Sequence, residues 1–330
     1  MSSSKVQDLE AFVRTLPKAE LHAHLHGSVR EDTLRALGCT GFVAQGRTLE
    51  ECFALFATIH DAVQDVNAVR RVAEDVVRDF AQDNVRYLEL RSTPRATAHM
   101  TKHEYLVTVA DAVRTAGAKH DVLVRLLVSL DRARDPSDAN DSLDVVKALP
   151  AHAKAMIVGV DLSGNPTKGR FADFVPALTR ARSELGLKVT IHCGEVHDDN
   201  EVAEILAFAP DRLGHALHVP ASLRAKGLPV VECCPTSNIK TLALDALHEH
   251  PVLPPVDWAH LVVCTDDAGV FETSLTKEMT MVAHEFRLSR DQIAQLTRAP
   301  LRHAFAHPKD IRSLEMRLWP SQTSSSSSRL

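Results

Sequence analysis

The first residues that could do chemistry are His22 and His24, which stand two positions apart in LPKAELHAHLHGSVR, residues 16–30. They follow an alternating apolar and polar run that predicts a β-strand over residues 18–24. Because alternate residues of a strand point to the same side, we expect both imidazoles to project together from the strand's end. Such a pair suits a divalent metal that prefers nitrogen ligands. The alternative is two inward-facing histidines with backbone partners.

Polar side chains recur where the other predicted strands end. They are Glu89, Arg91, Ser92, Thr93 and Arg95 after the second strand, Asp131 after the third, Asp161 and the SGN turn after the fourth, His192 and Glu195 after the fifth, His215 in RLGHALH, and Asp266 and Asp267 after LVVC. In barrel enzymes the active site lies at this face and is built from several strand ends. Consecutive strand ends that carry His, Asp, Glu or Arg therefore predict one shared site.

Asp266 and Asp267 are adjacent carboxylates that follow an apolar strand. Two carboxylates at a buried strand end are costly unless positive charge lies beside them. A metal held by His22, His24 and a third histidine would supply that charge, and such sites often keep a position open for water. Metal binding lowers the pKa of that water to roughly 7. The alternative is that the two aspartates cap the N-terminus of a helix.

The composition is that of an ordinary globular protein, with 330 residues, 45% hydrophobic and 25% charged. The net charge of −5 is spread along the chain, so we expect no nucleic-acid partner. We also expect no membrane span, because no apolar run approaches about 20 residues. The N-terminus MSSSKVQDLE lacks a signal-peptide core. The six cysteines form no CxxC pair, so we expect reduced, buried thiols in an intracellular protein.

Strands and helices alternate along the chain. The predicted strands are 18–24, 85–91, 122–129, 156–161, 188–193, 229–233 and 261–264. The predicted helices are 5–15, 30–37, 48–63, 67–83, 101–118, 137–148, 170–185, 198–208, 273–285 and 290–299. Repeated βα units at this length indicate a (β/α)8 barrel or a doubly wound sheet. No GxGxxG follows an early strand, which disfavours dinucleotide binding. We expect one domain over residues 1–320 and a disordered serine-rich tail over 321–330.

Several motifs, taken in chain order, resemble those of the adenosine/AMP deaminase family. They are LPKAELHAHLHGS, HCGE, RLGHALH, CPTSN and CTDDAGVF. RTLEECFALFATIH, YLELRSTPR and VDLSGNPT are similar to the adenosine deaminase-like branch, whose members hydrolyse N6-methyl-AMP to IMP and methylamine. The resemblance covers nearly the whole chain. It implies an α/β fold, a TIM (β/α)8 barrel with additional helices inserted after the first strand and at the C-terminus.

The same resemblance implies a zinc-dependent hydrolytic deaminase that acts on N6-methyl-AMP. One Zn²⁺ per chain would have the ligands His22, His24, His192 and Asp266. Glu195 would protonate purine N1 while zinc-bound hydroxide attacks C6, and His215 would act as base or electrostatic partner. Asp267 would bond N7 and orient the hydroxide, and the Gly164 N–H would meet N3. The alternatives are an adenosine or AMP deaminase of this family, or an amidohydrolase-like enzyme with another substrate. His215 on its own would be read as a core histidine.

A nucleotide substrate is suggested by the branch-specific run Arg91-Ser92-Thr93-Pro94-Arg95, whose arginines and hydroxyls suit a phosphate. The substrate contacts that the resemblance implies are His24, His26, His60, Ser92, Thr93, Arg95, Asp131, Gly164 and Asp267. The alternative for Arg95 is that it merely caps a loop. His26 departs from the family, which usually has an acid or an amide there. A histidine at this position could pair with a phosphate, or it could reflect a different substrate.

The expected partner is a small purine nucleotide, and the expected state is a monomer. We expect a cytoplasmic protein. The alternative is peroxisomal import, because Ser328-Arg329-Leu330 is one conservative change from the SKL signal.

Overall fold

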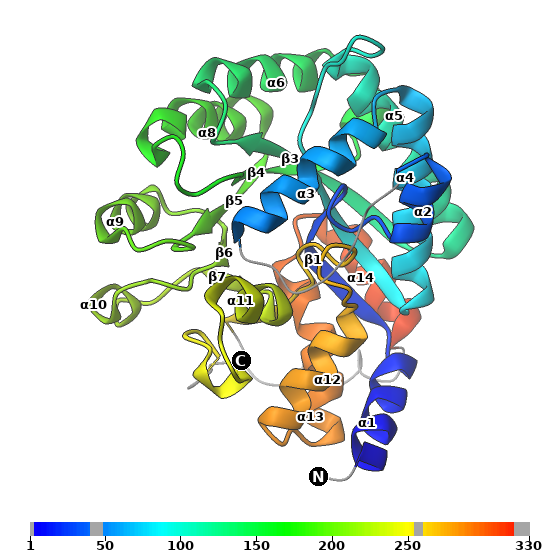
Figure 1. Ribbon diagram of the computed structural model, residues 1–330, viewed down its shortest axis with the longest axis vertical. Helices are drawn as coiled ribbons and strands as arrows, with labels where there is room; N and C mark the ends of the chain where they lie inside the picture. The colour runs from blue at the N-terminus through cyan, green and yellow to red at the C-terminus, as the bar shows by residue number, and fades with distance from the viewer. Residues whose placement is uncertain (1–2, 40–48, 254–259, 320–330) are drawn as a thin grey trace.

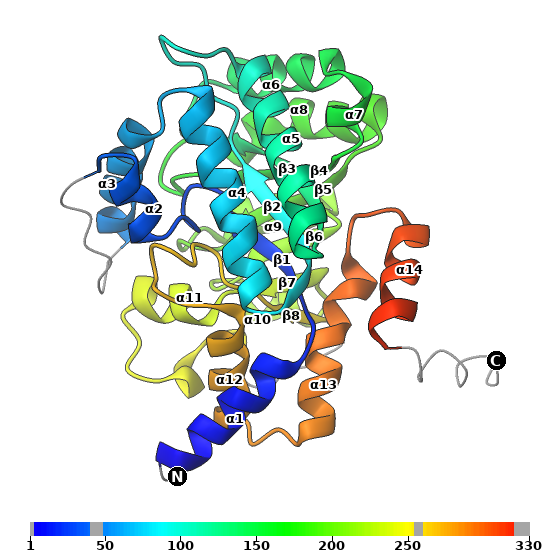
Figure 2. The same cartoon turned by 90° about the vertical axis from the view of Figure 1, so that its right-hand side faces the viewer.

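The computed structural model describes residues 3–39, 49–253 and 260–319. Within them, eight parallel strands form one sheet in sequential order. The strands are β1 (Lys18–His24), β2 (Val85–Ser92), β3 (Leu123–Asp131), β4 (Ile157–Ser163), β5 (Lys188–Cys193), β6 (Arg212–His215), β7 (Val230–Cys233) and β8 (Leu261–Val263). The sheet curls into a barrel with helices outside it (Figures 1 and 2). This confirms the TIM-like barrel and removes the doubly wound alternative.

The barrel closes through a short backbone contact, which we call the closure seam, between residues 22–24 and 265–266. An isolated bridge pairs Ala23 with Asp266. The Asp266 N–H donates to the His22 oxygen at 2.8 Å, and the His24 N–H donates to the Asp266 oxygen at 3.1 Å. The carboxylate of Glu20 adds a bond at 3.0 Å from the Thr265 N–H. Barrel closure therefore fixes the backbone of three predicted metal ligands.

Helices alternate with the strands on the outside. They are α1 (Ser3–Thr15), α2 (Glu31–Ala36), α3 (Leu49–Ala62), α4 (Val66–Gln82), α5 (Lys102–His120), α6 (Pro136–Ala148), α7 (Ala151–Lys154), α8 (Phe171–Leu185), α9 (Asp199–Phe208), α10 (Ala221–Arg224), α11 (Pro235–Leu242), α12 (Leu275–Glu285), α13 (Arg290–Arg298) and α14 (Pro308–Leu318), with 3-10 turns at Leu247–Glu249 and Ala299–His303. As predicted, extra helices follow β1 and extend the C-terminus. Figure 2 shows α2 and α3 on one side of the barrel and α14 on the other.

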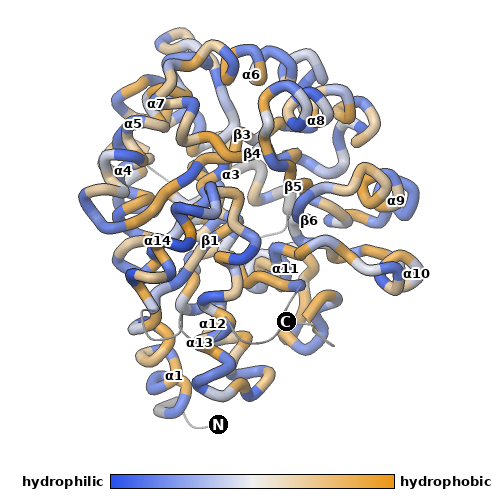
Figure 3. Tube along the Cα trace, turned by 180° about the vertical axis from the view of Figure 1, so that it is seen from behind, coloured by the Kyte–Doolittle hydropathy of each residue, from blue (hydrophilic) through white to orange (hydrophobic). Residues whose placement is uncertain are grey.

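Helix α4 illustrates how the sequence builds this outer layer. Its N-cap, Asp65, accepts hydrogen bonds from the next turn's amides, which satisfies donors that the helix itself leaves free. Val69, Val72 and Val76 recur at helical spacing and are buried against the barrel. Hydrophobic residues concentrate along the central strands β3 and β4 in Figure 3. No helix among the described residues is both long and apolar enough to cross a membrane.

Strand β6 is the main difference from the predicted elements. Its four residues, RLGH, include Gly214 and a charged Arg212, so they lack the apolar run that marks a buried strand. Arg212 is nevertheless buried, because it pairs with Glu89 and Glu232 inside the barrel. The short helices α7, α10 and α11 and the C-terminal α14 were also not predicted. The predicted tail, 321–330, lies outside the described residues.

A buried carboxyl in α12 gives a pH-dependent prediction. Glu278 accepts from the Thr236 N–H at 2.9 Å and contacts the Thr273 hydroxyl. Burial raises its pKa from 4.5 to about 7. The folded state therefore holds a proton that the unfolded chain releases above its lower pKa. The contribution of protonated Glu278 to the stability of the folded state is complete below about pH 4.5 and is lost as pH rises through 7.

Glu278→Gln mimics the protonated carboxyl and removes this pH dependence. We expect the unfolding free energy of the variant minus that of the wild type to increase by up to about 3 kcal/mol as pH rises from about 5 to 8. Denaturant unfolding of both proteins at the two pH values measures the change. A difference that stays constant over this range would contradict the assignment.

Candidate metal centre and active site

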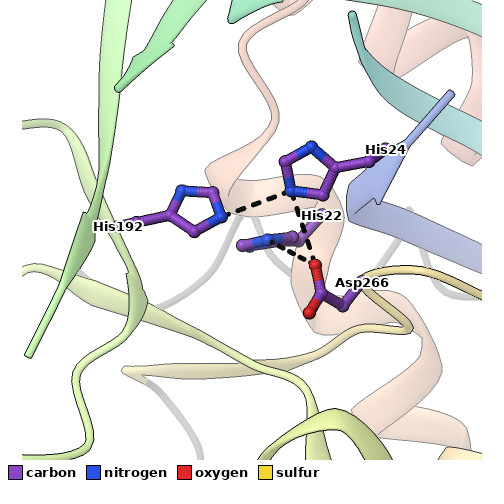
Figure 4. A group of neighbouring side chains, drawn as sticks. All are labelled: His22, His24, His192 and Asp266. Carbon is purple, nitrogen blue, oxygen red and sulfur yellow. Dashed lines mark hydrogen bonds and ion pairs between the residues drawn. The ribbon is translucent and has the colours of Figure 1, made fainter. Parts of the chain in front are cut away.

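Four side chains converge at the carboxyl end of the barrel: His22, His24, His192 and Asp266 (Figure 4). His22 and His24 come from β1, His192 comes from β5, and Asp266 follows β8. His24 Nε2 lies 3.2 Å from His192 Nε2. Asp266 Oδ1 lies 3.3 Å from His22 Nε2 and 3.4 Å from His24 Nε2. The structure thus brings together all four residues that were predicted as metal ligands.

This donor set fits a small divalent cation. A tetrahedron with ligands at about 2.0–2.1 Å has edges of about 3.3–3.4 Å. The three distances above, 3.2, 3.3 and 3.4 Å, are close to that length. His22 Nε2 is buried and has no hydrogen-bond partner. Burial and the neighbouring Asp266 raise the pKa of Asp267 well above its usual range. The residues present therefore form a metal-binding cluster.

Outer partners aim three of these ligands. His22 Nδ1 pairs with Glu232 at 2.8 Å, so its Nε2 faces the cluster. His192 Nδ1 pairs with Asp161 at 3.0 Å in the same way. The Ser237 hydroxyl donates to Asp266 Oδ2 at 2.7 Å and leaves Oδ1 toward the histidines. Hydrogen bonds of this kind fix the tautomer and orientation of metal ligands.

Two of these outer partners were missed from sequence. Glu232 stands in the apolar strand VVEC, where a lone acid is a signal of an internal partner. Ser237 lies in the CPTSN motif, which contributed to the family resemblance without a role for any of its residues. No local pattern identifies which histidine or carboxylate either one meets.

Glu195 and His215 lie beside the metal cluster in the same cavity. His215 Nε2 is 3.9 Å from Glu195 Oε1. Burial raises the pKa of Glu195, which favours the protonated carboxyl. The Asn238 side chain pairs with His215 Nδ1 at 2.9 Å, and its Oδ1 accepts from the Cys234 N–H at 3.3 Å. Asn238 also belongs to CPTSN and was not predicted as a site residue.

The backbone at this site adopts left-handed conformations that residues other than glycine rarely take. His215 has φ 59° and Asp266 has φ 62°. Such strain persists where surrounding contacts enforce it, and it is concentrated at functional sites. Gly164 has φ +97°, and a Cβ there would lie 2.2 Å from Asp131 Oδ1. Both residues line the cavity, so the backbone at Gly164 approaches it without a side chain.

Nearly all the residues that were predicted to contact the substrate line this cavity. Those that line it are His24, His26, His60, Ser92, Thr93, Asp131, Gly164 and Asp267. Phe56, Leu217 and Phe271 add apolar wall that was not predicted. Arg95 is absent from the described residues that line the cavity, and its Nη1 donates to the His60 backbone oxygen at 3.2 Å.

The arginine that opens the predicted phosphate run also borders the cavity, but its charge is already paired. Arg91 is fully buried and pairs with Asp161 and Glu232 inside the barrel. Its guanidinium is committed to these two acids, so we withdraw it from the phosphate contacts. In a sequence, an arginine beside hydroxyl residues indicates an anion site. Only the three-dimensional structure shows that Arg91 pairs with buried acids instead.

Comparison with known proteins agrees with this geometry. A family model described as Adenosine deaminase matches residues 17–318. The chain belongs to the adenosine deaminase family. This family member is 37% identical to the adenosine deaminase-like protein of Drosophila melanogaster, over 92% of this chain and 95% of the relative. It is 34% identical to the N6-methyl-AMP deaminase of Homo sapiens, over 89% of this chain and 90% of the relative.

Solved structures place the chain in the same branch of the adenosine deaminase family. The crystal structure of the Arabidopsis N6-mAMP deaminase MAPDA matches with a TM-score of 0.86 at 35% identity, over 93% of this chain and 99% of that one. Arabidopsis ADAL complexed with IMP matches with a TM-score of 0.84 at 34% identity, over 93% of this chain and 97% of that one. The predicted family and its adenosine deaminase-like branch are confirmed.

The close contact between Gly27 and Asp267 gives a testable prediction for this site. A Cβ at Gly27 would lie 1.6 Å from Asp267 Oδ1, so the carboxylate must move if any side chain is added. We expect Gly27→Ala to lower stability by about 1–3 kcal/mol, as overpacking does, and to lower deaminase turnover with it. Thermal unfolding and turnover measure the two effects. The neighbouring Ser28→Ala, which adds no volume, is the control, and equal effects of both variants would contradict this reading.

Proposed function

We propose that this chain is a zinc-dependent deaminase that hydrolyses N6-methyl-AMP to IMP and methylamine. The observation that carries the proposal is the cluster of His22, His24, His192 and Asp266 at the base of a cavity that also holds Glu195, His215 and Asp267. Relatives at about this identity are named N6-methyl-AMP deaminases, and a related structure contains IMP. Three imidazoles and one carboxylate are a donor set that zinc accepts.

The reaction adds the oxygen of water to purine C6 and breaks the bond from C6 to the exocyclic nitrogen, which leaves as methylamine. Zinc in this cluster would act as a Lewis acid that makes water nucleophilic at neutral pH. We assign Glu195 to donate a proton to N1, since its burial favours the protonated form. His215 and Asp267 would hold the attacking water by hydrogen bonds. The Gly164 N–H would meet N3.

The nucleotide's phosphate is assigned to a second group of cavity residues, His26, His60, Ser92 and Thr93. The rings of His26 and His60 lie with their centroids 4.9 Å apart. His26 is buried, and its Nε2 has no hydrogen-bond partner, so this ring nitrogen is free for a ligand. Hydrogen bonds to a phosphate are strong because the acceptor is charged. Arg95 would add positive charge from behind His60.

The proposed substrate is tested by incubating the purified protein with N6-methyl-AMP, AMP, N6-methyladenosine and adenosine. We expect turnover of N6-methyl-AMP, with methylamine released in equal amount to IMP. Turnover of AMP or adenosine in preference to their methylated forms would replace the proposal with the alternative reaction of the same family. No change in any purine would point to an amidohydrolase-like enzyme with another substrate.

His26→Asn tests the phosphate assignment separately. We expect KM for the nucleotide to rise roughly tenfold or more while turnover of the matching nucleoside, where detectable, changes little, because only the nucleotide carries the phosphate. Ser28→Ala is the control. Equal changes for nucleotide and nucleoside would remove His26 from the phosphate contacts.

We further propose that residues 1–320 form one catalytic domain and that the protein acts as a monomer in the cytosol. Sedimentation analysis tests the monomer. A fluorescent fusion that carries the last ten residues tests the alternative, peroxisomal import. A diffuse signal rejects the alternative, and a punctate peroxisomal signal rejects the cytosolic assignment.

A further inference from the structure

One fully buried arginine contacts the acids that orient the metal-binding cluster. Arg91 of β2 projects into the barrel, and its guanidinium has three partners there. Nη1 is 3.1 Å from Asp161 Oδ1, Nη2 bonds Glu232 Oε2, and Nη2 also donates to the Leu21 backbone oxygen at 3.0 Å. Leu21 is the residue before His22, so the same guanidinium contacts the strand that carries two of the proposed ligands.

The two acids that Arg91 bonds are the ones that aim the ligand histidines. Glu232 Oε2 is also the atom that pairs with His22 Nδ1, at 2.8 Å. Asp161 Oδ1 is also the atom that pairs with His192 Nδ1, at 3.0 Å. Each carboxylate oxygen is therefore shared between the arginine and one imidazole. The chain His22–Glu232–Arg91–Asp161–His192 is continuous.

We propose that Arg91 is a positioning residue for the metal centre, in which one guanidinium holds both carboxylates that orient His22 and His192. This rests on the metal site of the proposed function and adds a residue that sets its geometry. Arg91 is not one of the proposed ligands, and it acts through Glu232 and Asp161.

The chemistry of the side chain suits this role. The guanidinium is planar and keeps its charge, and its separate N–H groups can bond two acceptors in fixed directions. A lysine offers a single point charge, which cannot hold two carboxylates on opposite sides in the same way. Two buried carboxylates without a cation between them would also repel each other, and either one could then turn away from its imidazole.

Arg212 of β6 provides a matched control inside the same barrel. It is also almost completely buried, and it pairs with Glu89 and with Glu232. Its Nε lies 2.7 Å from Glu232 Oε1, the oxygen that does not meet His22. No contact of Arg212 with Asp161 appears among the described residues. Its loss should therefore affect the barrel interior without releasing the His192 partner.

The test measures metal affinity rather than activity. Arg91→Lys and Arg212→Lys are compared with wild type by competition for Zn²⁺ against a chromophoric chelator, and by the visible absorption spectrum of the Co²⁺-loaded protein. Circular dichroism verifies that each variant is folded. We expect Arg91→Lys to weaken zinc affinity roughly 10–100-fold, the range seen when partners of metal ligands are removed. Its Co²⁺ spectrum should also change, while Arg212→Lys stays within about threefold of wild type.

Asp161→Asn keeps the result decisive if Arg91→Lys does not fold. This variant leaves the arginine in place and removes the charged link to His192, and we expect it to weaken zinc affinity by a comparable factor. Wild-type affinity and an unchanged Co²⁺ spectrum in either folded variant would overturn the proposal. An equal loss in Arg212→Lys would also overturn it, because the effect would then belong to the barrel interior in general. Failure of the wild type to bind zinc would instead reject the proposed function.

Discussion

Replacing Glu195 with glutamine is expected to leave the metal bound and to remove nearly all turnover. Glu195 lies in the cavity beside His215, with 3.9 Å between Oε1 and Nε2, and burial raises its pKa. The glutamine has the same shape but cannot transfer a proton to purine N1. General acid catalysis typically contributes roughly 10²–10⁴-fold, so we expect kcat to fall by that factor.

Steady-state kinetics and zinc content of the same preparation measure the Glu195→Gln effect. Glu204→Gln is the matched control, since Glu204 is exposed on α9, outside the cavity. Because the glutamine side-chain amide can still hydrogen-bond purine N1, the affinity for the product IMP should change much less than kcat. A variant that keeps near wild-type kcat would exclude Glu195 as the proton donor, and a variant that loses its zinc would show a structural role instead.

Removing the metal is expected to abolish turnover and to lower the melting temperature. Three of the four proposed ligands, His22, His24 and Asp266, belong to the closure seam, so the ion would bind β1 to the segment after β8. A ligand that binds only the folded state stabilises it by about 4 kcal/mol at a free concentration 1,000 times its Kd. In a chain of this size, that corresponds to a shift of several degrees.

Differential scanning calorimetry and activity before and after dialysis against a strong chelator test this expectation. Addition of Zn²⁺ should restore both properties, and protein treated with zinc-saturated chelator is the control. Full turnover after elemental analysis has shown loss of the metal would contradict the proposed chemistry. An unchanged melting temperature would show that the seam is stable without the ion.

The elements that carry the site were predictable because their signals are local. The alternating run before His22 gave the first strand with its observed bounds, Lys18–His24. The acids after LVVC and the histidine of IHCGE follow strongly apolar strands, and parallel strands bring such ends to one face. Family motifs then chose among the 18 histidines, which spacing alone could not do.

The supporting contacts were not predictable because they join residues that are distant in the chain. Glu232 meets His22 from 210 positions away, and nothing near either residue encodes that pairing. Strand β6 was not predicted for a related reason, since the buried Arg212 has its partners, among them acids on β2 and β7, far away in the chain. Arg91 likewise resembled a phosphate contact until its internal partners were visible.

The closure seam also has a consequence for how the protein is made. His22 and His24 are synthesised early, whereas Asp266 comes near the end of the chain. A growing polypeptide that ends before β8 lacks the segment whose backbone pairs with residues 22–24. The complete set of four ligands exists only after that last strand emerges. Translation products that stop before Asp266 therefore lack one of the four residues of the metal-binding cluster.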